Sequence, residues 1–253
     1  MDLAISGRTA LVTGASAGIG AGIAECLARE GVRLALAGRN REALQDVARR
    51  TTAHGAPAPV LLTADVATEA GATSVARGAI DAFGGRVDFL INNAGGSRPA
   101  QGEQTEEFWQ EAHDLNFHAA RRLINLLVPS MKVARSGRII NITGAIFGSA
   151  INGAGPSKAA LLAYSRALAF ELGPFDITVN CVAPGRINSV QILEKLHPTE
   201  ESRAEYIRRN IPAGRFGDPA DMGNLVAFLV SPLAAYISGA HIPVDGGGVR
   251  MAP

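Results

Sequence analysis

Short runs of apolar and β-branched residues alternate with longer segments of helical periodicity along most of the chain. Such short runs are typical of strands that are buried on both faces of a parallel sheet, and the segments between them are typical of crossover helices. Because crossovers are right-handed, the helices fall on both faces of one sheet, and ligands bind beyond the carboxyl ends of the strands. We therefore predict a doubly wound α/β fold with a seven-stranded parallel sheet, its strands being Thr9–Thr13, Arg33–Ala37, Val60–Thr63, Val87–Ile91, Arg138–Ile142, Thr178–Val182 and His241–Val244.

The pattern continues without a break that would separate domains. Hydrophobic residues make up 47% of the 253 residues, which is enough for a substantial buried core, and no repeat or low-complexity linker divides the chain. We therefore predict a single domain over residues 1–253. Residues 188–212 depart from the alternation, because they are charged and directly follow a strand. We expect this segment to form a lid over the site, built as two short helices.

Charge and composition exclude several classes of partner. A formal net charge of +1 gives no broad field that would attract nucleic acid or an anionic membrane. No apolar run reaches the roughly 18 residues of a spanning helix, and the first residues lack the pattern of a secretion signal. We therefore expect a cytoplasmic protein that acts on small molecules. Cys26 and Cys181 are expected to be reduced core thiols, and no cluster has the spacing of a metal site.

A glycine-rich turn, Thr13–Gly20 (TGASAGIG), lies between the first predicted strand and the first predicted helix. This is the context that a dinucleotide-binding turn requires. Gly14 permits the tight turn, Gly18 lets a pyrophosphate approach the amides at a helix N-terminus, and Gly20 lets the helix pack against the strand. Three glycines also fit an ordinary turn when the motif is taken alone. In its context, the turn predicts a nicotinamide dinucleotide site in a Rossmann-type fold.

The end of the second predicted strand favours NADP(H) over NAD(H). NAD-binding proteins of this fold place an acidic residue there to hold the ribose 2′-hydroxyl, but this chain has Gly38, Arg39 and Asn40. The guanidinium of Arg39 has the fixed fork of donors that binds a 2′-phosphate, and Arg41 adds positive charge nearby. The alternative is that both arginines are solvated residues at the start of a helix.

Taken together, these motifs resemble the short-chain dehydrogenase/reductase family, and the resemblance covers essentially the whole chain. Besides the glycine turn, it rests on Asp65-Val66 after the third strand, Asn92-Asn93-Ala94-Gly95 after the fourth, Asn116 within a helix and Pro184-Gly185 after the sixth. The resemblance implies cofactor contacts along the turn, at the adenine, beside the central strand and at the nicotinamide end. These residues are Gly14, Ser16, Gly18, Ile19 and Gly20; Asp65 and Val66; Asn92, Ala94 and Gly95; and Pro184, Gly185, Ile187 and Ser189.

The resemblance also implies catalytic groups that this chain matches only in part. In the family, a tyrosine donates a proton to a ketone while hydride arrives from the nicotinamide, and a lysine four residues later lowers the pKa of that tyrosine and holds the ribose. A serine polarises the carbonyl, and an asparagine anchors a water. Lys158 and Asn116 match the lysine and the asparagine, but Ala154 and Gly144 occupy the places of the tyrosine and the serine.

Few residues are candidates to replace the missing groups. Thr143 is the hydroxyl nearest to the lost serine, although an ordinary strand-end threonine fits the position equally well. Tyr164 cannot substitute for the tyrosine, because it lies six residues past Lys158 and roughly 9 Å along the helix axis. Asparagine is unfavourable in a helix interior, so Asn116 predicts a functional kink there.

Other polar residues have both a functional and a structural interpretation. Arg186, beside the expected nicotinamide end, binds either a substrate carboxylate or phosphate, or forms a salt bridge to the lid. His197 and Tyr206 lie in the expected lid, either as surface residues or within reach of substrate. His113 and His118 lie on other helix faces than Asn116, where surface or packing roles are expected.

Three functions fit these residues. The first, which we favour, is an NADP(H)-dependent oxidoreductase acting on a small carbonyl, hydroxyl or related substrate, with proton transfer through water, substrate or a lid residue. The second is a lyase or isomerase on the same fold, and the third is a catalytically silent dinucleotide-binding protein, because function belongs to the site rather than the fold. The family resemblance and the apolar run 236–244 also predict a homo-oligomer, specifically a tetramer.

Overall fold

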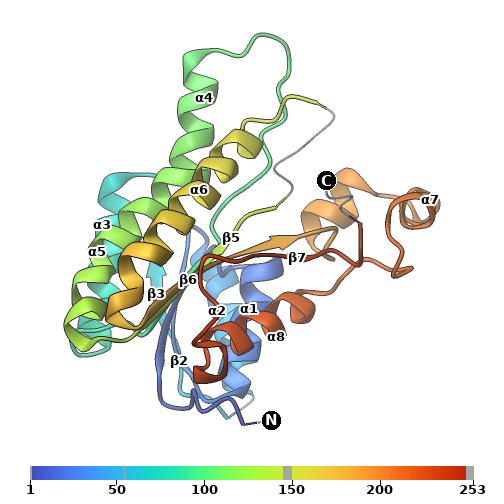
Figure 1. The fold of residues 1–253 in the computed structure, drawn as a ribbon. Coiled ribbons are helices and arrows are strands. Elements are labelled where there is room, and N and C mark those ends of the chain that lie inside the picture. Colours follow the sequence, from blue (N-terminus) through green and yellow to red (C-terminus); the bar gives the residue numbers. More distant parts are fainter. Residues whose placement is uncertain (1, 54, 145–149, 249–253) are drawn as a thin grey trace.

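The computed structural model describes residues 2–53, 55–144 and 150–248 and contains one seven-stranded sheet (Figure 1). The strand order is β3-β2-β1-β4-β5-β6-β7, and all the pairings are parallel. This confirms the predicted doubly wound α/β fold. The strands are β1 (Thr9–Thr13), β2 (Arg33–Gly38), β3 (Val60–Thr63), β4 (Phe89–Asn92), β5 (Gly137–Ile142), β6 (Ile177–Pro184) and β7 (His241–Val244).

Helices cover both faces of the sheet, so the core has two layers. Successive side chains of β1 point to opposite faces: Ala10 and Val12 join one buried cluster, and Leu11 joins the other. In Figure 1, α1 and α8 lie on one side of the sheet and α3, α5 and α6 on the other. The helices are α1 (Gly18–Arg29), α2 (Arg41–Thr52), α3 (Glu69–Ala82), α4 (Glu106–His113), α5 (Ala119–Ala134), α6 (Ala154–Leu172), α7 (Glu200–Asn210) and α8 (Pro219–Val230), with shorter turns η1 (Asp114–His118), η2 (Gly173–Phe175), η3 (Gln191–Leu196) and η4 (Pro232–Ala234).

The strand bounds differ from prediction at both ends of β4 and of β6, and β6 runs past Val182 to Pro184. Its first part pairs with β5, and its last four residues pair with β7. The backbone N–H of Gly185 then donates to the carbonyl of Val244 at 2.9 Å. The extension arises because β6 has a neighbour on each side, which the hydrophobic pattern of one strand does not reveal.

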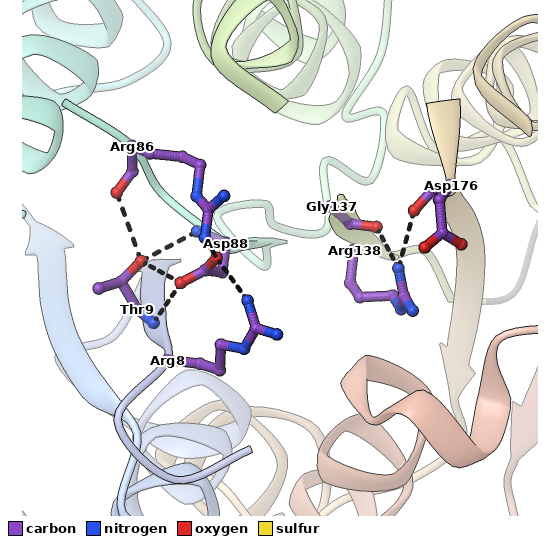
Figure 2. Close-up of polar contacts among 7 residues, drawn as sticks. All are labelled: Arg8, Thr9, Arg86, Asp88, Gly137, Arg138 and Asp176. Carbon is purple, nitrogen blue, oxygen red and sulfur yellow. Dashed lines mark hydrogen bonds and ion pairs between the residues drawn. The ribbon is translucent and has the colours of Figure 1, made fainter. Parts of the chain in front are cut away.

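Polar contacts fasten the amino ends of the central strands (Figure 2). The buried carboxylate of Asp88, just before β4, accepts hydrogen bonds from the backbone N–H and the hydroxyl of Thr9, each at 2.9 Å, and pairs with Arg8 and Arg86. Arg138 at the start of β5 donates to the carbonyls of residues 137 and 176 at 2.9 and 3.0 Å. These contacts lie at the amino ends of the strands, opposite the carboxyl ends, and fix how the strands align at the amino ends.

The segment 188–212 contains the two short helices expected of it, η3 and α7. It follows β6 and lies beyond the ends of β6 and β7 (Figure 1). Cys26 and Cys181 are both free and buried, in α1 and β6. In the part of the chain that the structure describes, no helix has the length and apolar character needed to cross a membrane.

Candidate functional site

The glycine turn follows β1 at the point where the strand order reverses, because β1 has β2 on one side and β4 on the other. Gly14 and Gly18 have φ angles of +61° and +54°, which L-residues with side chains rarely adopt. A Cβ atom on Gly20 would stand 2.3 Å from the carbonyl oxygen of Gly14, so the helix approaches the turn as closely as backbone allows. Each of the three glycines is therefore required by geometry.

Two residues that were not predicted as site residues hold this turn in place. The hydroxyl of Thr13 accepts hydrogen bonds from the backbone N–H groups of Asn93 and Ala94, both at 3.0 Å. The amide of Asn93 donates in return to the carbonyls of Thr13 and Gly14, at 3.0 and 3.1 Å. The sequence shows a threonine at the last position of one strand and a polar residue just after another. That these two residues contact each other follows only from the pairing of β1 with β4.

The adenosine end of the expected site brings together the ends of β1, β2 and β3. A Cβ atom on Gly38 would lie 3.6 Å from the hydroxyl of Ser16, so these two positions are neighbours. The guanidinium of Arg39 lies 3.8 Å from the carboxylate of Asp65, and 79% of the Arg39 side chain is exposed. Val66 is buried in the core cluster beside β1. Arg39 is therefore loosely held and can turn toward a ligand.

A buried polar ladder runs from the end of β4 to α6. The amide of Asn92 donates to the Asn141 carbonyl oxygen at 2.8 Å, and the amide of Asn141 donates to the Ser165 hydroxyl at 2.8 Å. Within residues 2–53, 55–144 and 150–248, the side-chain oxygen of Asn92 has no hydrogen-bond partner although it is buried. Buried polar atoms normally have a hydrogen-bond partner. The side-chain oxygen of Asn92 can therefore accept a hydrogen bond from a further donor.

The irregularity predicted around Asn116 takes the form of the π-helix η1, between α4 and α5. Asn116 is buried there, and its side-chain oxygen accepts from the backbone N–H of Gly96 at 3.0 Å while its amide donates to the Ala112 carbonyl at 3.0 Å. A Cβ atom on Gly95 would lie 3.1 Å from that oxygen and 3.4 Å from Nζ of Lys158. The loop after β4 therefore brings Asn116 and Lys158 to one place, as the family resemblance implies.

Lys158 lies on the first turns of α6 and reaches the end of β5. Its Nζ donates to the carbonyl of Ile142 at 3.2 Å and also to the carbonyl of Thr143. Burial disfavours the charged form and lowers the pKa of Lys158 to about 8. The hydroxyl of Thr143 has other partners, the Val182 carbonyl and a ring nitrogen of His241, each at 3.3 Å. This geometry favours the structural interpretation of Thr143, an ordinary strand-end threonine.

The positions of the absent tyrosine and serine lie around this lysine. Ala154 is the first residue of α6, one helical turn before Lys158, and is buried. Gly144 has a φ of +134°, and a Cβ atom there would come no nearer than 4.0 Å to the Lys158 side chain. Among the described residues, no side-chain hydroxyl bonds to Nζ of Lys158. The hydroxyl of Tyr164 instead donates to the Asn125 side chain at 3.3 Å.

The histidines near Asn116 have packing roles, as expected. His113 bonds through Nδ1 to the hydroxyl of Ser157 at 3.0 Å, which joins α4 to α6. His118 accepts from Arg121 at 3.3 Å, and burial lowers its pKa. In the described parts of the chain, no group of three or more His, Cys, Asp or Glu side chains is placed to hold a metal ion.

The segment after β6 closes the site from the other side. A Cβ atom on Gly18 would lie 3.3 Å from Cβ of Ser189, so the expected nicotinamide segment returns to the glycine turn. Pro184 ends β6, Gly185 is fastened to β7, and Ile187 is 2% exposed and packs in the core. The segment that follows β6 is therefore placed next to the glycine turn, at the carboxyl ends of the strands.

Comparisons with known proteins agree with this geometry. Residues 14–248 match the family described as enoyl-(acyl carrier protein) reductase. The rhamnolipid biosynthesis 3-oxoacyl-[acyl-carrier-protein] reductase of Pseudomonas aeruginosa is 38% identical, with 96% of each chain covered. L-sorbose reductase from Gluconobacter frateurii, solved with NADPH and L-sorbose, superposes with a TM-score of 0.93 at 32% identity over 100% of both chains. A 7α-hydroxysteroid dehydrogenase, solved with NADH and 7-oxo glycochenodeoxycholic acid, gives 0.90 at 32% identity over 100% of this chain and 98% of the other. The chain belongs to the short-chain dehydrogenase/reductase family of oxidoreductases.

Proposed function

We propose that the chain is an NADP(H)-dependent oxidoreductase with a non-standard active site, acting on a small carbonyl, hydroxyl or related substrate. The observation that carries the proposal is the glycine turn, which the Thr13 and Asn93 contacts hold open at the switch point of the sheet. Gly18 lies beside Ser189, so a residue expected at the pyrophosphate and one expected at the nicotinamide are neighbours. When bound, the cofactor supplies or accepts a hydride.

Arg39 supports the choice of NADP(H). The relatives described above were solved with NADPH in one case and NADH in the other, so the family alone does not decide the cofactor. Arg39 is exposed, and its nearest carboxylate is 3.8 Å away, which leaves the guanidinium able to form short paired hydrogen bonds to a 2′-phosphate. Such a charge-assisted contact of about 1.5 to 3 kcal/mol corresponds to roughly a 10- to 150-fold preference.

Titration calorimetry with NADP⁺ and NAD⁺ tests this choice on the wild type and on Arg39→Ala. We expect the wild type to prefer NADP⁺ and Arg39→Ala to lose most of that preference. Arg49→Ala is the matched control, because Arg49 lies on the following helix and is paired with Asp46. Equal affinities for the two cofactors in the wild type would refute the preference for NADP(H).

The residues around Lys158 indicate how the site can support the reaction. Below pH 8 the Lys158 ammonium is protonated in most molecules, and it places a positive charge at the end of β5. Asn116 is held beside it by Gly96, but Ala154 and Gly144 offer no proton donor. A substrate proton therefore comes from water, from the substrate or from the lid. Substrates that spread the developing charge, such as enones, depend least on an adjacent acid.

Loss of NADPH absorbance in the presence of ketones, imines and enones tests for turnover. We expect the wild type to oxidise NADPH with at least one enone or imine and only slowly with simple ketones, and Lys158→Ala to be slower on every substrate. Cofactor binding without turnover on the whole panel would contradict an oxidoreductase and favour a silent dinucleotide-binding protein. Conversion of a substrate without a change in the cofactor would favour a lyase or isomerase.

We also propose that the chain forms a homotetramer. Large apolar side chains are exposed on α5, on α6 and before β7, among them Val133 at 89% and Phe170 at 90%. Apolar surface of this kind is typically covered by a second copy in proteins with closed symmetry. Light scattering at micromolar concentration should give four times the mass of the chain, and a monomer would contradict the proposal. The cytoplasmic location stays a prediction.

A further inference from the structure

Four side chains form a cluster where the lid segment meets the end of β6, here called the lid cluster: Arg186, His197, Tyr206 and Phe216. The guanidinium of Arg186 lies over the ring of Tyr206, 4.9 Å from its centroid. The ring of His197 lies 4.6 Å from that of Tyr206 and 5.4 Å from that of Phe216. The ring of Tyr206, which packs against His197, therefore holds Arg186 in place by stacking.

The charge of Arg186 is not balanced by any carboxylate in residues 2–53, 55–144 and 150–248. Among the other arginines near this segment, Arg203 donates to the backbone carbonyls of His197 and Pro198, whereas three are paired with carboxylates. Arg208 and Arg209 pair with Glu205, and Arg215 pairs with Asp221. An arginine that is fixed by stacking but has no counter-ion is unusual, since guanidinium groups inside proteins are normally paired. The salt bridge to the lid that the sequence allowed does not form with the described residues.

Two side-chain nitrogens in the lid cluster also lack hydrogen-bond partners among the described residues. Nε of Arg186 and Nε2 of His197 are buried, and neither has a hydrogen-bond partner among the described residues. The other ring nitrogen of His197 bonds to the Ser202 hydroxyl at 3.2 Å, and the residue as a whole is 8% exposed. Leaving such groups unpaired is unfavourable. The missing partner of Nε of Arg186 is an acceptor, whereas Nε2 of His197 needs an acceptor or a donor according to the tautomer of its ring.

The position of Arg186 places this unbalanced charge at the substrate end of the crevice. Arg186 directly follows Pro184 and Gly185 and precedes Ser189, which lies beside the glycine turn. Its backbone carbonyl accepts from the N–H of Gly217 at 2.9 Å, so the backbone under the side chain is anchored. A side chain leaving this segment toward the lid lies between the cofactor surface and α7.

We propose that Arg186 binds a carboxylate group of the substrate, so that the preferred substrates are oxo acids or the corresponding hydroxy acids. This inference rests on the proposed function, whose substrate class it names. A carboxylate matches the site because it is planar, carries one negative charge and accepts two parallel hydrogen bonds from one guanidinium. A phosphate carries nearly two charges and would require a second cation.

Binding to the protein loaded with NADP⁺ tests the proposal without hydride transfer, because an oxo acid and NADP⁺ are both oxidised. The probes are 4-oxopentanoate, 5-oxohexanoate and 6-oxoheptanoate, each compared by calorimetry with its methyl ester. We expect the wild type to bind at least one acid about 10- to 100-fold more tightly than its ester. Arg186→Met should abolish the difference, and Arg186→Lys should retain part of it.

Arg209→Met is the matched control, because it removes one positive charge from the lid helix α7 while Arg186 stays in place. It should bind the acids as the wild type does. The acid–ester comparison in the wild type needs no variant, so it remains decisive if Arg186→Met does not fold. Equal binding of every acid and ester, or no binding of any acid, would overturn the proposal, as would an Arg186→Met variant that keeps the preference.

Two further results are separable from these. Titration with inorganic phosphate that depends on Arg186, in the absence of any acid preference, would overturn the carboxylate assignment in favour of a phosphate group. A protein that failed to bind NADP⁺ in a separate titration would count against the proposed function, and the acid–ester comparison would then be made on the protein alone.

Discussion

The β1–α1 turn and the start of α6 both contact the loop after β4, and they differ in the side chains that they supply. At the turn, backbone shape and side-chain chemistry agree: the glycines adopt the required φ angles, and Thr13 and Asn93 fasten them. At the start of α6, the helix, Lys158 and the neighbouring loop are in place, but Ala154 has no proton to give. The backbone is regular in both regions, and the proposed non-standard active site concerns only the start of α6.

This difference shows that the two requirements of the site are physically independent. Cofactor binding depends on backbone amides at the helix N-terminus and on close packing of the helix against the turn. This packing leaves no room for a side chain at Gly20. Proton transfer depends on one group at one position, and its loss leaves the surrounding contacts intact. Lys158 lies at the start of α6, where it donates to the carbonyls at the end of β5 and places its charge one helical turn from Ala154.

Rebuilding the proton donor should give the largest effect. Ala154→Tyr with Gly144→Ser places a phenol one turn before Lys158 and a hydroxyl nearby, and NADPH-dependent reduction of a simple ketone should rise by about 10²- to 10⁴-fold. Each single variant should gain less, because the groups act as a unit. The serine is the weaker half of the pair, since φ at Gly144 is +134° and a side chain there is strained.

Tyr164→Phe is the control for this experiment, because that hydroxyl bonds to Asn125. It should leave the ketone rate unchanged in the rebuilt protein. Rapid ketone reduction by the wild type, unaffected at Ala154, would instead show that another group donates the proton.

The second prediction concerns Lys158 and pH. An unfolded lysine keeps its proton up to a pH of about 10.4, whereas burial lowers the pKa of Lys158 in the folded protein to about 8. Between these values the unfolded state binds more protons, so the unfolding free energy of the wild type rises with pH. Relative to Lys158→Met, the wild type should gain on the order of 3 kcal/mol from pH 7.5 to 10.5.

Urea denaturation of both proteins across this pH range measures the gap. Lys132→Met controls for the removal of a positive charge, since Lys132 pairs with Glu171 at the other end of α6. A gap between wild type and Lys158→Met that stays constant with pH would show that the lysine is solvated and not held by burial.

The smallest effect tests the packing of the turn. Gly20→Ala puts a methyl group 2.3 Å from the Gly14 carbonyl oxygen, and the overpacking should lower the unfolding free energy by about 1 to 3 kcal/mol and weaken NADP⁺ binding. At Gly173, after α6, a Cβ atom meets nothing within 4 Å, so Gly173→Ala should be neutral or slightly stabilising. Thermal denaturation measures the stability of the two variants, and calorimetry measures their affinity for NADP⁺. Equal stability and equal affinity of Gly20→Ala and Gly173→Ala would contradict the argument that close packing requires a glycine at position 20.

Much of the fold was predictable because the sheet is buried on both faces, which makes each strand a short apolar run. β1, β3 and β7 have the predicted bounds, and the turn after β1 was identified from its glycines and context. The contacts that sequence could not supply join distant strands. Thr13 with Asn93, and Thr143 with His241, depend on which strands are neighbours, and no local pattern encodes that adjacency.

Contacts between distant parts of the chain were also missed in the segment 188–212. Sequence reasoning placed Arg186 beside the nicotinamide end and left two partners open, a substrate anion or a lid carboxylate. The structure shows that the side chain stacks on Tyr206. A stacking partner twenty residues away carries no charge signal, so the arrangement becomes visible only when α7 is packed against the end of β6.

Residues that meet at the carboxyl ends of the strands are far apart along the chain. This separation has a consequence for protein synthesis. The hydroxyl of Thr13 meets the backbone of Asn93 across 80 positions, and Gly18 lies beside Ser189. A ribosome completes the glycine turn long before Ser189 emerges. Long-range contacts of this kind form slowly. We therefore expect the cofactor to stabilise only chains in which the glycine turn and the segment after β6 are both folded. A chain cut before Ser189 would keep the glycine turn but would gain no stability from the ligand.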